Sequence, residues 1–157
     1  MSRKKAREVV LCLVFEKEYH KDVKCAALYD DLIELAESSE DLQDFRNSLT
    51  DTDKEYIKET FFGVFENLEQ IDDIISNSII GWKYNRISKI SMALLRIAVY
   101  EIMNKNESVT PSVAINEAVA LSKIYDDSKA YGFVNGVLGA VAKNISNISN
   151  ISNISRV

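Results

Sequence analysis

The chain has 157 residues, about one domain, of which 46% are hydrophobic and 27% charged. One proline and five glycines are too few for a collagen-like chain, a flexible linker or a sandwich with many hairpins, so they favour a helical protein. One histidine and two cysteines cannot supply the four ligands of a typical zinc site or build a disulfide framework. Two reduced thiols are typical of a cytoplasmic protein. No segment reaches the ~18 uninterrupted apolar residues of a membrane span, so we expect no membrane partner.

The net charge of −5 conceals three blocks of different sign. Residues 1–25 carry seven basic and four acidic side chains, residues 26–76 carry three and fifteen, and residues 77–157 carry nine and five. This asymmetry suggests one face for an anion and another for a cationic partner. Chance variation among solvated helix faces explains the block counts equally well.

Apolar residues recur every three or four positions through almost the whole chain, which predicts amphipathic helices. The expected helices cover residues 3–20, 25–37, 53–79, 87–102, 111–125 and 133–141, with a break at 38–41. No segment shows convincing strand alternation. The sequence therefore predicts an all-α bundle of about seven helices, which forms one domain over residues 1–143.

Two helix starts carry capping signals. Thr52 and Glu55 fit a capping box in front of the strongest periodic segment, which we expect to be one long helix that ends near Gly81. Thr110 followed by Pro111 suits an N-cap with proline at the first helical position.

Residues 144–155 repeat Asn-Ile-Ser four times. A period of three keeps isoleucine on neither a helix face nor a strand face. We therefore expect residues 144–157 to form a low-complexity, disordered tail.

The search for catalytic motifs is negative, because neither glycine-rich phosphate loop pattern is present. Asp72 and Asp73, like Asp126 and Asp127, are adjacent carboxylates that point about 100° apart on a helix. They are more typical of a solvated face and a helix cap than of a metal site. Cys12 lies on an apolar helix and is expected in the core. We predict that the chain is not an enzyme and uses no cofactor or metal.

Nucleic-acid chemistry has better support. Four cations lie in or before the first helical turn, where the helix dipole is already positive: Arg3, Lys4, Lys5 and Arg7. We expect Arg7 to lie off the apolar stripe. Cations at the positive end of a helix dipole lower the stability of the helix, so a cluster of them there indicates a phosphate ligand. Phe15 and Tyr19 follow on the same helix and could stack on unpaired bases, although Phe15 suits the core equally well.

Several strings, in a fixed order, resemble the NusB family. They lie at residues 3–8, at Trp82 with Arg86, and at residues 94–102, 111–119 and 133–138. The resemblance spans residues 3–142 and implies an all-α fold of two packed helical bundles. It also implies a transcription antitermination factor that binds boxA of nascent ribosomal RNA with the ribosomal protein NusE. That complex joins NusA, NusG and RNA polymerase.

The resemblance assigns RNA contact to the N-terminal cations, to Phe15 and to the stretch before the last helix, where Lys129 and Phe133 match the family. Tyr131 stands in a position where the family often has another polar residue, and could stack on a base instead. Arg96 is expected to pack or to bond internally. The acidic block is expected to face NusE through Glu66, Glu69 and Asp73, with a contribution from Ser91.

Other functions stay open. A helical protein–protein adaptor without an RNA role would explain the acidic block, although the N-terminal cations argue against it. NusB-like domains also occur fused to ribosomal-RNA cytosine methyltransferases, so the RNA-binding domain of an RNA-modifying system is a further alternative. The sequence does not decide between a monomer and a homodimer.

Overall fold

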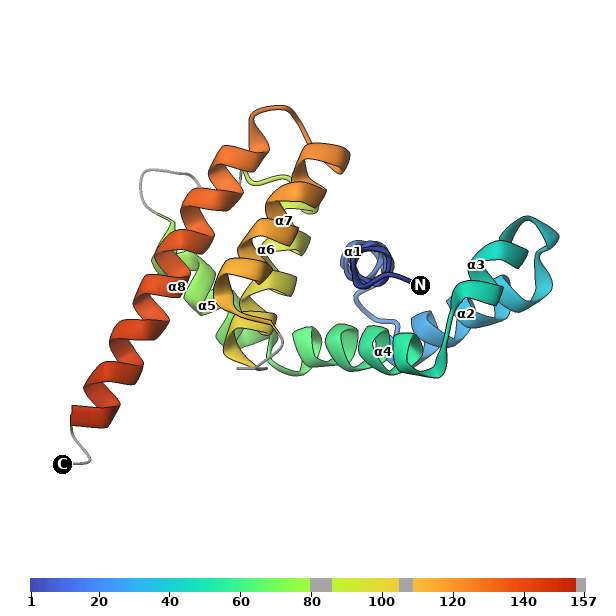
Figure 1. Cartoon of the computed structure of the whole chain (residues 1–157), viewed down its shortest axis with the longest axis horizontal. Helices are drawn as coiled ribbons and strands as arrows, with labels where there is room; N and C mark the ends of the chain where they lie inside the picture. Colours follow the sequence, from blue (N-terminus) through green and yellow to red (C-terminus); the bar gives the residue numbers. More distant parts are fainter. Residues whose placement is uncertain (80–85, 105–108, 155–157) are drawn as a thin grey trace. The chain divides into compact units, whose positions relative to one another are not determined.

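The computed structural model describes residues 1–79, 86–104 and 109–154, with side chains placed as far as residue 146. Every element in these ranges is a helix (Figure 1). They are α1 (Arg3–Tyr19), α2 (Cys25–Ser38), the 3-10 helix η1 (Glu40–Leu42), α3 (Gln43–Ser48), α4 (Asp51–Glu66), α5 (Leu68–Ser78), α6 (Lys89–Met103), α7 (Pro111–Tyr125) and α8 (Ala130–Ile154). The predicted all-α class is confirmed, with eight α-helices in the described ranges where the sequence predicts about seven. Trp82 and the helix end expected near Gly81 lie outside these ranges.

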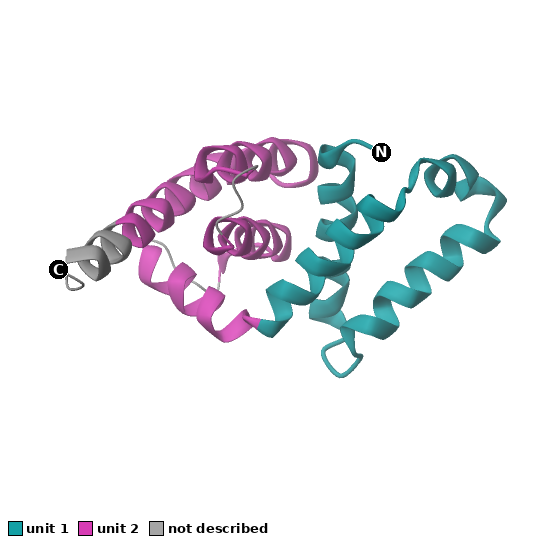
Figure 2. Cartoon of the chain, turned by 60° about the horizontal axis from the view of Figure 1, so that its bottom comes forward, with its two compact units in different colours: residues 1–66 teal, residues 67–157 magenta. Residues whose placement is uncertain are grey.

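The chain divides into two compact units, residues 1–66 and 67–157 (Figure 2). In unit 1, α1 packs on α4, and both helices contact α2. Phe61 of α4 is fully buried there and makes edge contacts with the rings of Phe62 and Phe65. The apolar stripe of α1, which includes Val10 and Val14, completes this core.

In unit 2, α6 is the central helix, because it packs against α5, α7 and α8. Every residue from Ser91 to Val99 is buried. A helix in this position needs apolar residues on all its faces, which is why its sequence carries no charge between Lys89 and Arg96.

The expected long helix is two helices, α4 and α5, separated by Asn67. The backbone of Asn67 has φ −114° and ψ 19°, outside the helical range, and asparagine favours caps and turns over helix interiors. Ile57, before the break, is buried in unit 1, whereas Ile71 and Ile75 belong to the core of unit 2. The prediction of one helix was wrong because the apolar spacing runs through Asn67 without interruption.

Helix caps explain where two helices begin. The capping box of α4 lies two residues earlier than predicted, at Thr50 and Asp53. The Thr50 hydroxyl accepts from the Asp53 amide at 3.2 Å, while the Thr50 amide donates to Asp53 Oδ2 at 3.0 Å. At α7 the predicted cap is confirmed, because Thr110 accepts from the Val113 amide at 3.3 Å and Pro111 is the first helical residue. Two short elements that the periodicity did not predict, η1 and α3, follow α2 over residues 40–48.

The last helix extends further than the sequence predicts. α8 runs without interruption to Ile154, into the repeat that we expected to be disordered. Ile145 is half-buried against the core of unit 2, four residues after the buried Val141 and therefore on the same helix face. Asn144 Nδ2 donates to the Ser78 hydroxyl at 3.4 Å. In this structure the first triplet of the repeat is part of unit 2.

Candidate nucleic-acid interface

The first turn of α1 carries three exposed cations, Arg3, Lys4 and Lys5. Ser2 caps the helix by accepting from the Lys5 amide at 3.1 Å, and no acidic residue lies in this first turn. The cations therefore add to the positive end of the helix dipole. Exposed amide donors and like charges at one helix end favour an anionic ligand.

Tyr56 of α4 lies beneath Arg3. The Arg3 guanidinium carbon lies 3.9 Å from the centroid of the Tyr56 ring, a close cation–π contact that orders an otherwise flexible side chain. The Arg7 guanidinium carbon lies 6.0 Å from the same centroid. Sequence reasoning could not find Tyr56, because the contact joins α1 to a helix that lies far along the chain.

Arg7 is buried, with 5% of its surface exposed. The expectation that Arg7 lies off the apolar stripe was wrong, because α1 turns this side chain toward α4. Its long apolar stem packs inside unit 1. In this structure Arg7 supports the packing of α1, and the exposed charge of the cluster comes from Arg3, Lys4 and Lys5.

Two aromatic residues continue the same helix. The ring centroids of Phe15 and Tyr19 lie 5.2 Å apart with the planes tilted by 59°. Phe15 is half-buried and Tyr19 is strongly exposed. The pair leaves an accessible aromatic surface on α1, with Phe15 at its inner edge.

The second predicted RNA stretch lies at the start of α8 in unit 2. Lys129 and Tyr131 are exposed, whereas Phe133 is half-buried and packs on the core of unit 2. The Lys129 amide donates to Asp127 Oδ1 at 3.2 Å, so Asp127 caps the turn that precedes the helix. The accessible groups of this stretch are Lys129 and Tyr131.

Asp126 fixes the connection between α7 and α8 to the start of α6. Its Oδ2 accepts from the hydroxyls of Ser88 at 2.7 Å and Ser91 at 2.6 Å. Burial alone would raise the pKa of Asp126, but these hydroxyls and the backbone amides of Asp127 and Ser91 lower the pKa overall. Ser91, predicted as a partner contact, is 2% exposed and has this internal role instead.

The three acidic side chains expected to face NusE are accessible. Glu66 ends α4 in unit 1, while Glu69 and Asp73 lie on α5 in unit 2, and all three are exposed. Asp72 is different, because both of its carboxylate oxygens accept from Arg96. Asp72 is therefore held in an internal ion pair, whereas the carboxylate of the adjacent Asp73 is accessible.

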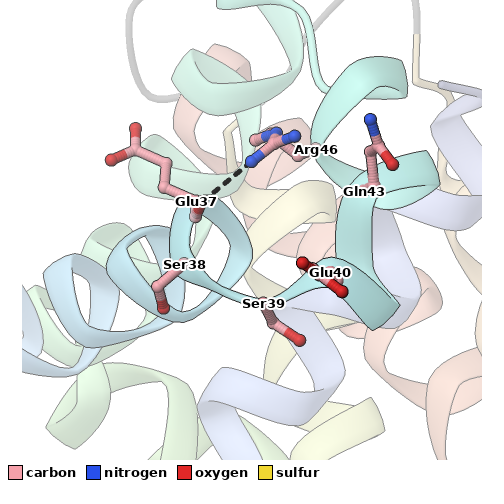
Figure 3. A pocket seen from close by; sticks show the side chains of 6 residues that line it. All are labelled: Glu37, Ser38, Ser39, Glu40, Gln43 and Arg46. Atoms are coloured by element: carbon pink, nitrogen blue, oxygen red, sulfur yellow. Dashed lines mark hydrogen bonds between the residues drawn. The ribbon is translucent and has the colours of Figure 1, made fainter.

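A polar hollow of about 320 Å³ lies between α2 and α3 of unit 1 (Figure 3). Its lining residues are Glu37, Ser38, Ser39, Glu40, Gln43 and Arg46. Arg46 Nη1 donates to the Glu37 carbonyl at 2.8 Å, so the one basic residue of the lining is engaged by the protein itself. No residue of the predicted sites lines this hollow.

Neither cysteine has the properties of a reactive thiol. Cys12 is exposed, so the expectation that it packs in the core was wrong, and Cys25 is half-buried. Desolvation is the main cause that raises the pKa of each thiol, and for Cys12 the carboxylates Glu8 and Glu16 raise it further.

In the described ranges, no three His, Cys, Asp or Glu side chains are grouped to hold a metal ion. None of the helices that the structure describes combines the length and the apolarity needed to cross a membrane.

The chain is similar to known proteins over most of its length. The NusB family model matches residues 4–143. The chain is 39% identical over 145 residues to the transcription antitermination protein NusB of Clostridium perfringens, covering 92% of this chain and 99% of that protein. It is 36% identical over 143 residues to the NusB of Acetivibrio thermocellus, covering 91% and 90%.

Two solved structures share the fold. T. maritima NusB superposes with a TM-score of 0.73 at 29% identity, over 91% of this chain and 92% of that one. A structure of the antitermination factors NusB and NusE in complex with double-stranded RNA matches with a TM-score of 0.73 at 26% identity, over 90% and 96%. Sequence and fold agree over nearly the whole length, and the chain belongs to the NusB family.

Proposed function

We propose that the protein is a transcription antitermination factor that binds the boxA element of nascent ribosomal RNA together with NusE. The complex then joins NusA, NusG and RNA polymerase in the cytoplasm. The protein contributes binding surfaces and no catalysis. The single observation that carries the RNA part is the exposed cluster of Arg3, Lys4 and Lys5 on the capped first turn of α1. The relatives' names support the antitermination role, and the NusB–NusE–RNA structure supports NusE as a partner.

The proposed RNA surface has two parts, each described within its own unit. In unit 1 the three cations contact phosphates, and the Phe15–Tyr19 pair stacks on bases. In unit 2 Lys129 contacts a phosphate and Tyr131 a base. Lysine at positions 4 and 5 holds phosphate as a point charge, whereas Arg3 has the planar fork for two parallel hydrogen bonds. We leave Arg7 and Phe133 out of the direct contacts because each packs inside its unit.

For NusE we propose the exposed acidic side chains Glu66, Glu69 and Asp73. A cationic ribosomal protein would be drawn to them by charge complementarity, which mainly speeds association and sets orientation. Ser91 is left out because it is buried against Asp126. Charge reversal of all three carboxylates should slow association with NusE at low salt while RNA binding alone is kept. A wild-type association rate would place the NusE contact elsewhere.

A gel-shift titration of boxA RNA, with and without NusE, tests the RNA part directly. Replacing Arg3, Lys4 and Lys5 together by alanine should weaken binding by more than tenfold at low salt, since phosphate contacts dominate affinity. Lys21→Ala is the matched control, because Lys21 is an exposed cation just beyond the other end of α1. Equal affinity of the triple variant and the control would remove the cluster from the RNA site.

The second candidate is a protein–protein adaptor without an RNA role. It is favoured by the exposed carboxylates of α2, η1 and α3, which are Asp30, Asp31, Glu34, Glu37, Glu40, Asp41 and Asp44. A pull-down of NusE in the presence of competitor RNA separates the two functions. Cooperative binding of NusE and boxA RNA supports the proposed function, and binding of NusE that is indifferent to RNA supports the adaptor.

A further inference from the structure

One aromatic ring of α4 holds the exposed arginine of the N-terminal cluster. The Arg3 guanidinium carbon lies 3.9 Å from the centroid of the Tyr56 ring, so the two groups are in van der Waals contact. Tyr56 is half-buried, and the packing of unit 1 limits the movement of its ring, whereas Arg3 is exposed. Arg7, one turn further along α1, lies 6.0 Å from the same centroid. Tyr56 therefore lies where α1 packs on α4 (Figure 1).

Arg3 and Lys5 are held in different ways. Lys5 Nζ lies 3.2 Å from Glu8 Oε2, so a carboxylate one turn along α1 partly neutralises this cation. The Tyr56 ring carries no charge, and within the described ranges Arg3 forms no ion pair with a carboxylate. The contact with Tyr56 thus orders the Arg3 side chain without pairing its charge.

A planar guanidinium can contact a ring and a phosphate at the same time. Its face lies on the ring, while its N–H donors lie in its plane and point outward, in the fork that matches two phosphate oxygens. The exposed carboxylates Glu55 and Glu59 neighbour Tyr56 on α4 and weaken the long-range attraction of an anion to this place. A phosphate is therefore held here mainly by short, directed hydrogen bonds, and these require an ordered Arg3.

We infer that Tyr56 is a positioning residue for RNA binding, which holds the Arg3 guanidinium in the orientation that receives a phosphate. Long side chains lose rotamer entropy when binding immobilises them, and a side chain that is ordered beforehand loses less. Tyr56 therefore raises the affinity without touching the RNA. The inference rests on the proposed RNA-binding function and adds a residue of α4 to a cluster that belongs to α1.

The experiment titrates a single-stranded boxA RNA with the full chain and its variants at low salt. Tyr56→Leu keeps apolar bulk but removes the ring, and should weaken binding by about two- to tenfold, the effect of ordering one long side chain in advance. Tyr56→Phe keeps the ring and should bind within about twofold of the unaltered chain. In the Arg3→Ala background, Tyr56→Leu should have no further effect, because the two residues act as one unit.

Phe62→Leu is the matched control. Phe62 is a second half-buried ring of α4 with a cation beside it, since the Lys58 ammonium nitrogen lies 5.6 Å from its centroid. This variant should bind RNA as the unaltered chain does, even where its melting temperature falls. NMR relaxation of the Arg3 Nε–H group gives a second readout, because Arg3 should be ordered in the unaltered, RNA-free chain and mobile in the Tyr56→Leu variant.

A Tyr56→Leu variant that binds RNA like the Phe62→Leu control overturns the inference and leaves the proposed function intact. An equal loss of affinity in the Arg3→Ala background also overturns it, since Tyr56 would then act only through the packing of α1 on α4. A mobile Arg3 in the unaltered chain overturns it whether or not the Tyr56→Leu variant folds. If the unaltered chain does not bind the RNA, the proposed function fails together with the inference.

Discussion

Arg96 of α6 and Asp72 of α5 form a bidentate ion pair inside unit 2. Arg96 Nε donates to Asp72 Oδ1 at 2.9 Å, and Nη2 donates to Oδ2 at 3.0 Å. Two parallel charge-assisted bonds fix the orientation of both side chains. The pair therefore sets how α5 lies on α6, in agreement with the internal bond expected for Arg96.

Asp72→Ala should destabilise the protein by about 3 kcal/mol, because it removes the carboxylate that neutralises a buried guanidinium. Urea denaturation followed by circular dichroism measures the change. Asp73→Ala is the matched control, one residue further along and exposed, and should change the free energy of unfolding by less than about 0.5 kcal/mol. Equal stability of the two variants would show that the ion pair is not structural.

Stability should fall in acid through Asp126 and Asp53. The backbone amide of Thr50 is the main cause that lowers the pKa of Asp53, and the Ser91 and Ser88 hydroxyls offset burial to lower that of Asp126. A carboxyl with a lowered pKa in the folded state stabilises fully above its unfolded pKa, about 3.9, and that stabilisation is lost as pH falls through the folded value. The free energy of unfolding should therefore be level near pH 7 and decline below about pH 4.

Asp126→Asn tests whether the Asp126 carboxylate causes part of this loss of stability in acid. The variant should be less stable than the unaltered chain at pH 7, and the difference between them should shrink as the pH is lowered toward 3. Urea unfolding at a series of pH values provides the measurement. Asp73→Asn serves as the control, and a difference that stays constant with pH would contradict the role given to Asp126.

Arg3 and Arg7 should respond differently to charge reversal. Arg7→Glu places a carboxylate in a buried position and should lower stability by about 2–4 kcal/mol. Arg3→Glu changes an exposed residue and should weaken RNA binding with little effect on the melting temperature. Thermal melts and RNA titrations of both variants check this, and normal stability of the Arg7 variant would show that its side chain is not held inside unit 1.

RNA affinity should depend on salt. With the three exposed cations of α1 and Lys129 on phosphates, the plot of log K against log salt should have a slope of about −2.8, from roughly 0.7 per phosphate of a single strand. Replacing Arg3, Lys4 and Lys5 by alanine should reduce the magnitude of the slope to about 0.7, the share of Lys129. Titrations at several salt concentrations between about 50 and 200 mM provide the test, because the affinity should fall by about tenfold or more over this range. An unchanged slope would assign the phosphate contacts to other residues.

Two truncations locate the end of the folded part. A chain that stops after Lys143 loses the half-buried Ile145 and the Asn144–Ser78 hydrogen bond, which should cost about 1 kcal/mol or 2–4 °C. A chain that stops after Ser146 keeps both contacts and should melt like the full chain. Both should bind RNA normally. Equal melting of the two truncated chains would mean that the first triplet contributes nothing.

Local patterns in the sequence predict a helix well where all its apolar residues pack into the same core. The apolar spacing of α1 and the Thr110–Pro111 start of α7 are confirmed by the structure. The break at Asn67 was not predictable in this way, because the same stripe continues from one core into the next. The accessible cations of α1 could be predicted from the run of basic residues at the start of the chain and from the family resemblance. The burial of Arg7 and the bond of Ser91 to Asp126 depend on helices brought together in space, which periodicity does not encode.

The burial of α6 from Ser91 to Val99 has a consequence for the stage of synthesis at which this helix is made. Synthesis proceeds from the N-terminus at about 5–20 residues per second, so α6 leaves the ribosome seconds before α7 and α8. Until they arrive, α5 alone is available to cover a helix whose residues from Ser91 to Val99 all end in the core. Nascent chains stalled in this interval expose the largely apolar surface of α6, the kind of surface that chaperones bind and that aggregates when they do not.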